Sequence, residues 1–245
     1  MKTILQILLF IITGVLTITM VNAQQKSRIV IVAFGNSTTA PRKNVDSVYA
    51  VRLGWILTQK GIPNRVINSG IPGSTTGSIK DNNLFKIAHG MDRFDTAVLR
   101  YHPDWVIIDF GINDSWQDAG KKGHSRISIG EYRHNLSFFI DHIRKINGRV
   151  ILLTPNPLGK KYKGYHTRRL KEYMRVVCKL ARRKKVPLIN TWKLYAQYVH
   201  KRGEGIDALL LDGEHPNDEG HKIIAHAVAG IIIPYVLSRR EQQPK

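Results

Sequence analysis

The chain is poor in cysteine, and Cys178 is the single one among its 245 residues. A disulfide needs two cysteines, so no bridge can form within the chain and the hydrophobic core must hold the fold by itself. Hydrophobic residues make up 42% of the sequence, which is enough for one substantial core at this length. Cys178 lies in a helical pattern, and we expect it to fill space rather than act as a nucleophile.

Acidic residues are also scarce. Asp and Glu number 18 against 38 Lys and Arg, which gives a formal net charge of +20. Such a field attracts polyanions, for example uronic-acid polysaccharides, anionic lipid surfaces or nucleic acid. The charge is densest between residues 159 and 185, where Glu172 is the only acid. A helix face kept soluble by its charge explains the same stretch, so charge alone does not identify the partner.

The sequence also lacks the usual signatures of metal and nucleotide sites. His221 and His226 are five residues apart, so they do not share a helix face well, and no third ligand follows at metal spacing. Residues 70–75 contain the glycines of a phosphate loop without its Gly-Lys-Ser/Thr core. We therefore expect no metal, no cofactor, and neither a nucleotide nor a nucleic acid as ligand.

The first residues have the pattern of an export signal. Lys2 precedes an apolar stretch from residue 4 to about 21, and Val21-Asn22-Ala23 offers small residues where a signal peptidase cuts. We expect a signal peptide at 1–23 and a secreted or periplasmic domain at 24–245, with a polar tail from about 239. An uncleaved membrane anchor is the alternative, since the stretch approaches the ~20 residues of a spanning helix.

Short apolar runs alternate with segments of helical spacing along the rest of the chain. The runs predict five strands, at 28–34, 65–68, 104–110, 149–154 and 186–190. The helical patterns cover 45–60, part of 81–100, 129–146, 168–185, 192–201 and 217–237. This alternation is typical of a parallel sheet covered by helices on both faces. The prediction is one α/β domain, a three-layer α/β/α sandwich with a five-stranded parallel sheet.

Four short motifs fall where such a sheet would gather them. Ser37, Gly73 and Asn113 each follow a predicted strand, and the loop from Asp212 to His215 precedes the last helix. The carboxyl ends of parallel strands open a crevice at one edge of the sheet, so all four motifs should meet there.

Together these residues can carry out acyl transfer. A serine hydroxyl is a weak nucleophile unless a base accepts its proton, and an aspartate three residues before a histidine can orient the imidazole for that task. Taken singly, Ser37, Gly73, Asn113 and the Asp212 turn are explained as ordinary turn or cap residues, and His215 as a solvated loop histidine. Their convergence favours a serine esterase with Ser37 as nucleophile, His215 as base and Asp212 as its partner.

The ordered set of four motifs resembles the SGNH hydrolases, the superfamily that includes the GDSL esterases. The resemblance implies a flavodoxin-like fold and an oxyanion hole formed by the backbone N–H groups of Ser37 and Gly73 and the side chain of Asn113. One position departs from the family pattern: where the family has Gly-Asp-Ser, this chain has Gly35-Asn36-Ser37. A neutral amide there replaces a carboxylate, which leaves the local charge open.

The substrate is predicted from side chains near these motifs. Trp116 offers an aromatic face to a sugar ring, although a core role explains it equally well. Lys160, Lys161 and Lys163 lie in a loop after the fourth strand and could hold carboxylates of an acidic glycan. The first hypothesis is hydrolysis of O-acetyl esters on a carbohydrate such as pectin. The alternatives are a lipid or lysophospholipid acylhydrolase, and a binding module for acidic polysaccharide on a decayed hydrolase fold.

Overall fold

A computed structural model of the chain describes residues 28–162 and 164–242. The expected signal peptide at 1–23 lies outside the described residues, as do Lys163 and the last three residues of the tail.

The centre of the molecule is a parallel sheet of five strands in the order β2-β1-β3-β4-β5. Every neighbouring pair is parallel. The strands are β1 (Ile29–Gly35), β2 (Asn64–Gly70), β3 (Trp105–Asp109), β4 (Arg149–Leu153) and β5 (Leu188–Ile189). The prediction of a five-stranded parallel α/β fold is confirmed.

Successive side chains of the inner strands point to opposite faces of the sheet, and both faces are covered. In β1, Ile31 and Ala33 belong to one buried cluster while Val32 and Phe34 belong to the other. This is why the run reads as continuously apolar in the sequence rather than alternating. The helices are α2 (Tyr49–Gln59), α3 (Gly90–Ala97), α4 (Ile112–Ser115), α5 (Ile129–Lys145), α6 (Tyr165–Lys184), α7 (Thr191–His200) and α8 (Asp218–Glu241).

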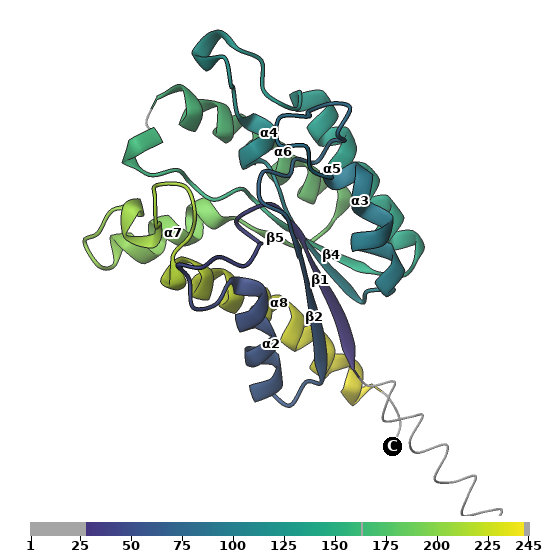
Figure 1. Cartoon of the computed structure of the whole chain (residues 1–245). Helices are drawn as coiled ribbons and strands as arrows, with labels where there is room; N and C mark the ends of the chain where they lie inside the picture. The colour runs from purple at the N-terminus through teal and green to yellow at the C-terminus, as the bar shows by residue number, and fades with distance from the viewer. Residues whose placement is uncertain (1–27, 163, 243–245) are drawn as a thin grey trace, which may run out of the picture.

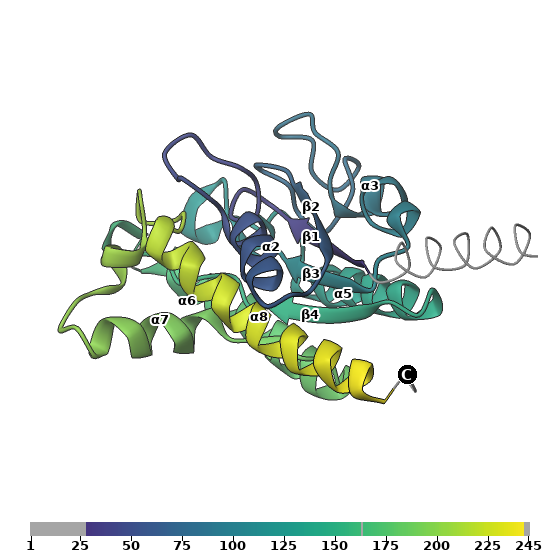
Figure 2. The same cartoon turned by 90° about the horizontal axis from the view of Figure 1, so that it is seen from below.

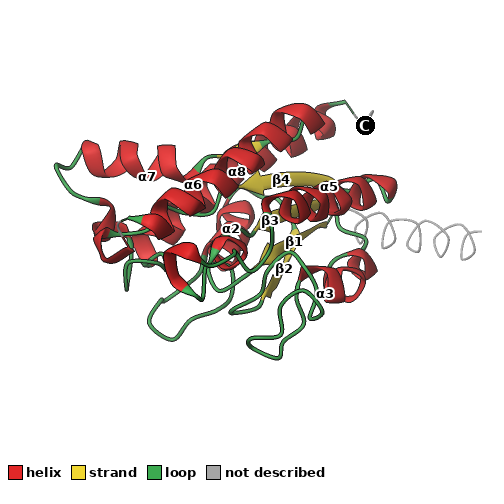
Figure 3. Cartoon of the chain, turned by 90° about the horizontal axis from the view of Figure 1, so that it is seen from above, coloured by secondary structure: helices red, strands yellow, loops and turns green. Residues whose placement is uncertain are grey.

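The helices form the two outer layers of the sandwich. Side chains of α2, α7 and α8 pack in the first cluster, and those of α3, α5 and α6 pack in the second. Figure 1 shows α2 and α8 on one side of the sheet and α3 and α5 on the other, and Figure 3 shows helices on both sides of the strands.

The first and last helices of the described domain pack against each other, as Figure 2 shows. His221 on α8 accepts a hydrogen bond from the backbone N–H of Tyr49 on α2 through Nδ1, at 3.3 Å. Asp218 accepts from Ser47 N at 3.3 Å and forms an ion pair with Arg52. These contacts join the two ends of the domain.

Helix α8 is long and apolar enough to cross a membrane by length and composition, and it is the only such helix within residues 28–162 and 164–242. Its apolar side chains include Ile224, Val228 and Ile232, which are buried in the cluster shared with α2. The hydropathy of α8 is therefore accounted for by its place in the core.

One predicted strand is shorter in the structure than in the sequence pattern, and the helix expected over part of 81–100 is now located. The strand expected at 186–190 is reduced to Leu188–Ile189, because Pro187 has no N–H to donate and Asn190 already caps α7. Of the stretch 81–100, only Gly90–Ala97 is α-helical. A one-turn helix, α4, was not predicted and contains Asn113.

Candidate active site

Ser37 lies in a tight turn directly after β1. Asn36 Oδ1 accepts hydrogen bonds from Thr38 N at 2.9 Å and from Thr38 Oγ1 at 2.8 Å. The hydroxyls of Thr38 and Thr39 also reach Asp109 Oδ2 at the end of β3, at 2.9 and 3.2 Å. The residues on both sides of Ser37 are therefore buried and tied down, while Ser37 itself is half-buried.

The loop that carries His215 is held closed by its own backbone. Leu210 and Pro216 form an isolated antiparallel bridge, and Leu211 N donates to His215 O at 2.8 Å. Inside the loop, Asp212 Oδ1 accepts from His215 N at 2.9 Å. Because one carboxylate oxygen fixes the backbone, the other is left to face the imidazole.

Ser37, His215 and Asp212 are brought together by these two loops. His215 Nε2 lies 3.0 Å from Ser37 Oγ, and His215 Nδ1 lies 2.8 Å from Asp212 Oδ2. Partial burial alone would raise the pKa of Asp212, but hydrogen bonds from the backbone and ring of His215 and from Glu214 N lower this pKa to about 2. Asp212 is therefore a carboxylate at neutral pH.

Three N–H donors face the same opening. The backbone N–H groups of Ser37 and Gly73 donate to no other residue in the described part of the chain. Asn113 Nδ2 donates one hydrogen to Ser74 O at 3.2 Å, and Asn113 Oδ1 accepts from Arg126 Nη1 at 3.3 Å, which fixes the amide. The second hydrogen of that amide is left for a ligand.

Gly73 needs to be glycine for two reasons. Its φ is +78°, which side chains rarely adopt, and a Cβ there would lie 2.7 Å from the Phe85 ring. The glycine of the family motif therefore stands at a position where the loop geometry requires glycine.

A cavity of about 580 Å³ opens over these groups. Its lining residues are Ser37, Arg42, Pro72, Gly73, Phe85, Ile87, Asn113, Trp116, Arg126, Glu214 and His215. Trp116 is thus brought to the site, where its ring stacks on His166 at 4.2 Å between centroids. Lys160 and Lys161 are exposed outside this lining, and Lys163 lies outside the described residues.

Three charged residues of the cavity were not predicted. Glu214 stands between Asp212 and His215, so its position in the motif was a usable signal, whereas Arg42 and Arg126 come from loops without a pattern. Burial raises the pKa of Glu214, and its carboxylate lies 3.8 Å from His215 Nε2. Arg126 forms an ion pair with Asp118 at 2.7 Å.

Two further carboxyl groups are buried beneath the site. Burial raises the pKa of Asp109 to about 6, against hydrogen bonds from Thr38 and Thr39 that lower it. Burial likewise raises the pKa of Asp114 to about 6, although Thr76 donates to its Oδ1 from both N and Oγ1. Within the described ranges, no three His, Cys, Asp or Glu side chains cluster as metal ligands would.

A doubly covered parallel sheet with hydroxyl, imidazole and carboxylate groups at one edge is the architecture of the SGNH class of hydrolases. The sequence model of the GDSL-like Lipase/Acylhydrolase family matches residues 33–223, so the chain belongs to that family. It is accordingly an ester hydrolase, as its sequence predicts.

Similar proteins agree with this assignment. An acetylxylan esterase of Geobacillus stearothermophilus is 27% identical over 165 residues, which are 66% of this chain and 69% of that protein. An uncharacterised lipoprotein of Bacillus subtilis is 26% identical over 226 residues, covering 81% of this chain and 87% of its own.

Among solved structures, a lipase/acylhydrolase from Enterococcus faecalis superposes with a TM-score of 0.67 and 27% identity, over 83% of this chain and 95% of that one. A catalytic mutant of an acetylxylan esterase from Geobacillus stearothermophilus superposes with a TM-score of 0.64 and 25% identity, over 82% of this chain and 92% of that one.

Proposed function

We propose that the protein is an exported serine esterase that removes small acyl groups, chiefly O-acetyl, from a carbohydrate by means of a Ser37-His215-Asp212 triad. The observation that carries this proposal is the pair of contacts made by one imidazole, 3.0 Å to Ser37 Oγ and 2.8 Å to Asp212 Oδ2. These distances fall within the hydrogen-bonding range in which a base and its orienting group act on a nucleophile.

The chemistry follows from this arrangement. Ser37 Oγ attacks the acyl carbon while His215 Nε2 accepts its proton, and Asp212 holds the tautomer with the proton on Nδ1. His215 then returns the proton to the leaving alcohol, which leaves an acyl-enzyme. His215 next accepts a proton from water as the water oxygen attacks the acyl carbon of the acyl-enzyme. The proton then passes from His215 to Ser37 Oγ as the acid is released.

The three donors that face the cavity have a role in this scheme. The oxyanion of each tetrahedral intermediate would accept from the N–H groups of Ser37 and Gly73 and from the side chain of Asn113. Donors that are already fixed need no rearrangement as charge develops, and loss of one typically costs ~10²–10³ in turnover.

Several observations support a polar, anionic carbohydrate as the substrate. The cavity is lined by Arg42, Arg126 and Glu214 as well as apolar side chains, and Trp116 offers a ring to a sugar. Arg42 forms no ion pair within the described residues, so it is available to a carboxylate beside the ester. The acetylxylan esterase relative supports an acetylated carbohydrate. The N-terminal sequence and the lipoprotein relative support export.

Turnover of nitrophenyl acetate tests the triad. Ser37→Ala and His215→Ala are each expected to lower kcat by about 10⁴ or more while the circular dichroism spectrum is unchanged. Ser238→Ala and His226→Ala remove the same groups from exposed positions on α8 and control for the substitutions themselves. Retention of activity in Ser37→Ala would remove the assignment.

The substrate class needs a separate measurement. Acetyl esters should be hydrolysed faster than octanoyl or longer esters, and acetylated pectin should release more acetate than acetylated xylan or chitin oligomers. A preference for long acyl chains would favour the lipid acylhydrolase instead.

A further inference from the structure

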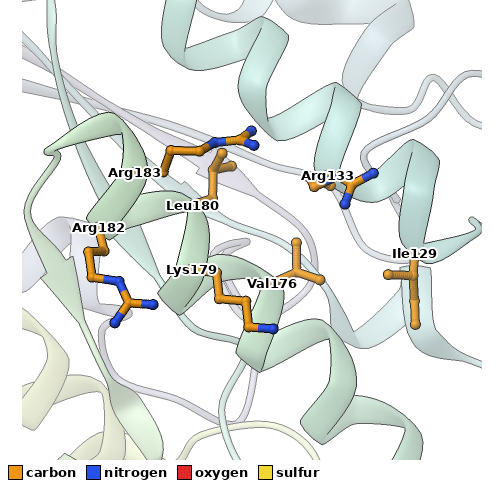
Figure 4. A pocket seen from close by; sticks show the side chains of 7 residues that line it. All are labelled: Ile129, Arg133, Val176, Lys179, Leu180, Arg182 and Arg183. Atoms are coloured by element: carbon orange, nitrogen blue, oxygen red, sulfur yellow. The ribbon is translucent and has the colours of Figure 1, made fainter.

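A second cavity, of about 480 Å³, lies between α5 and α6 and shares no residue with the cavity over Ser37. We call it the α5–α6 groove. Its floor is apolar and recessed, because Leu180 is buried and Ile129 and Val176 are half-buried. Its remaining lining residues are Arg133 on α5 and Lys179, Arg182 and Arg183 on α6, as Figure 4 shows.

The spacing of α6 produces this composition. Val176, Lys179, Leu180 and Arg183 occupy positions i, i+3, i+4 and i+7, so they form one stripe along the helix. The stripe places apolar side chains against α5 and cations at the rim. Lys179 and Arg183 are four residues apart, and like charges at this spacing repel each other in a helix. A bound anion would relieve that repulsion.

No carboxylate neutralises the groove. Its four cations form no ion pair and no side-chain hydrogen bond within residues 28–162 and 164–242. The acids nearest along the two helices already have partners: Glu172 is 2.6 Å from Arg169, Asp141 is 2.7 Å from Lys184, and Glu131 closes the capping box of α5. Four cations without a carboxylate partner thus line a concave site with room for a ligand.

We propose that the α5–α6 groove binds a carboxylated stretch of polysaccharide, as a second site separate from the hydrolytic cavity. Guanidinium groups match carboxylates in a two-pronged geometry, and the aliphatic floor can take the C–H faces of the sugar rings. Uronate residues repeat along a chain, so one polymer segment presents carboxylates to both helices at once. Holding the polymer here raises the local concentration of its esters at Ser37, an advantage that rests on the proposed function.

Two other polyanions fit the groove less well. The lining contains no aromatic side chain, whereas single-stranded nucleic acid is held chiefly by bases stacked on aromatic rings. An anionic membrane would be met by protruding apolar side chains, but Leu180 is buried and Ile129 and Val176 are half-buried, whereas the four cations are exposed.

Binding of unesterified polygalacturonate oligomers tests the proposal, because that probe has no ester to hydrolyse and its binding does not depend on the esterase chemistry. The groove variant is Arg133→Gln/Lys179→Gln/Arg183→Gln. The matched control, Lys60→Gln/Lys193→Gln/Lys201→Gln, removes the same charge from exposed lysines elsewhere. Circular dichroism and thermal unfolding establish that both variants fold. Dissociation constants are measured by fluorescence anisotropy at two salt concentrations.

The groove variant should weaken binding about tenfold or more, since three charge contacts are lost, and the control should change it less than about threefold. Neutral dextran should bind neither protein. Equal weakening in both variants would show that only the overall field attracts the polymer and would overturn the site. Tighter, groove-dependent binding of single-stranded DNA or of phosphatidylglycerol vesicles would overturn the choice of polysaccharide. A failed esterase proposal would leave all these results unaffected.

Discussion

At the scale of single residues, Asn36 stands beside Ser37 where the family has an aspartate. A carboxylate from another strand, that of Asp109, contacts the same threonine hydroxyl as Asn36. Asn36 Oδ1 and Asp109 Oδ2 lie 2.8 and 2.9 Å from the same Thr38 hydroxyl. That hydroxyl has one hydrogen for two acceptors. Burial already raises the pKa of Asp109 to about 6, so the ionised form of even this one carboxyl group is disfavoured here.

Asn36→Asp would place a second carboxyl group across Thr38 from Asp109. Two buried carboxylates that share a site cannot both ionise readily. We expect Asn36→Asp to lower stability by ~1–3 kcal/mol at neutral pH and to reduce turnover, since the Ser37 turn must shift. The exchanged pair Asn36→Asp/Asp109→Asn should recover most of both losses. Urea unfolding and kcat/KM on nitrophenyl acetate are the measurements, and a single variant more active than wild type would show instead that Asn36 impairs the site.

Gly73 provides a test of the proposed oxyanion hole. In Gly73→Ala the new methyl group meets the Phe85 ring at a φ of +78°, so the ring or the loop must shift, and we expect the N–H to be displaced. We expect kcat/KM to fall ~100-fold, as for other lost oxyanion donors. Gly61 has a similar φ of +67° with open space around it, so Gly61→Ala carries the backbone strain alone. That control should lose stability and keep its turnover. Equal activity of the two variants would contradict a role for the Gly73 N–H.

At the scale of elements, the start of α8 sets the position of His215. Asn217 caps the helix by accepting from Gly220 N at 3.0 Å, and its Nδ2 donates to Ala208 O at 2.9 Å. One side chain thus joins α8 to the 3-10 helix at Ile206–Leu209, and the histidine loop lies between these two segments.

Asn217→Ala should therefore cost about 1 kcal/mol in unfolding free energy as a lost cap, and should also lower kcat because the loop is released. Asn190→Ala removes the corresponding cap from α7, where Asn190 accepts from Lys193 N at 3.0 Å. We expect a similar loss of stability there with normal turnover. Chemical unfolding and steady-state kinetics of both variants decide the matter, and parallel losses of activity would argue against a specific role of Asn217.

Most strands, and the turns that follow them, could be predicted from the sequence, because buried parallel strands give continuous apolar runs and each run ends at a turn. The positions of Ser37, Gly73, Asn113 and His215 at one sheet edge follow from that alone. Arg42 and Arg126 could not be predicted, since their approach to the cavity depends on how irregular loops fold back. The loop of Lys160 and Lys161 follows β4 as predicted but lies outside the cavity lining, because it is tied to the turn of Gly213 and to Asp207 instead.

At the scale of the whole molecule, the contact between α2 and α8 includes a buried histidine, whose Nδ1 accepts from Tyr49 N. Burial, and next Arg52, lowers the pKa of His221 from 6.5 to about 3. Below pH 6.5 the imidazole of His221 is therefore protonated in the unfolded chain but stays neutral in the folded protein until the pH approaches 3. The stability that comes from His221 is fully present above this pH and is lost as the pH falls toward 3.

We predict that His221→Gln destabilises the protein at pH 8, where Tyr49 N loses its acceptor, and that the gap to wild type narrows on acidification. Each pH unit between about 6.5 and 3 should remove at most ~1.4 kcal/mol from the difference. Asp109 and Asp114, whose raised pKa values make stability depend on pH in the opposite sense, are present in wild type and variant alike. Their contribution therefore cancels in the difference in unfolding free energy between the two proteins. Denaturant unfolding at pH 8, 6 and 5 gives the difference, with the exposed His226→Gln as control. A gap that is constant with pH would contradict the prediction.

The distance along the chain between Ser37 and its proposed base, His215, has a consequence for biosynthesis. Ser37 and His215 are 178 positions apart, and the strand that carries the serine is made first. For most of translation the growing polypeptide holds an inert hydroxyl, because the imidazole has not yet been added. The proposed activity can therefore begin only after residue 215 has been made and α8 has docked.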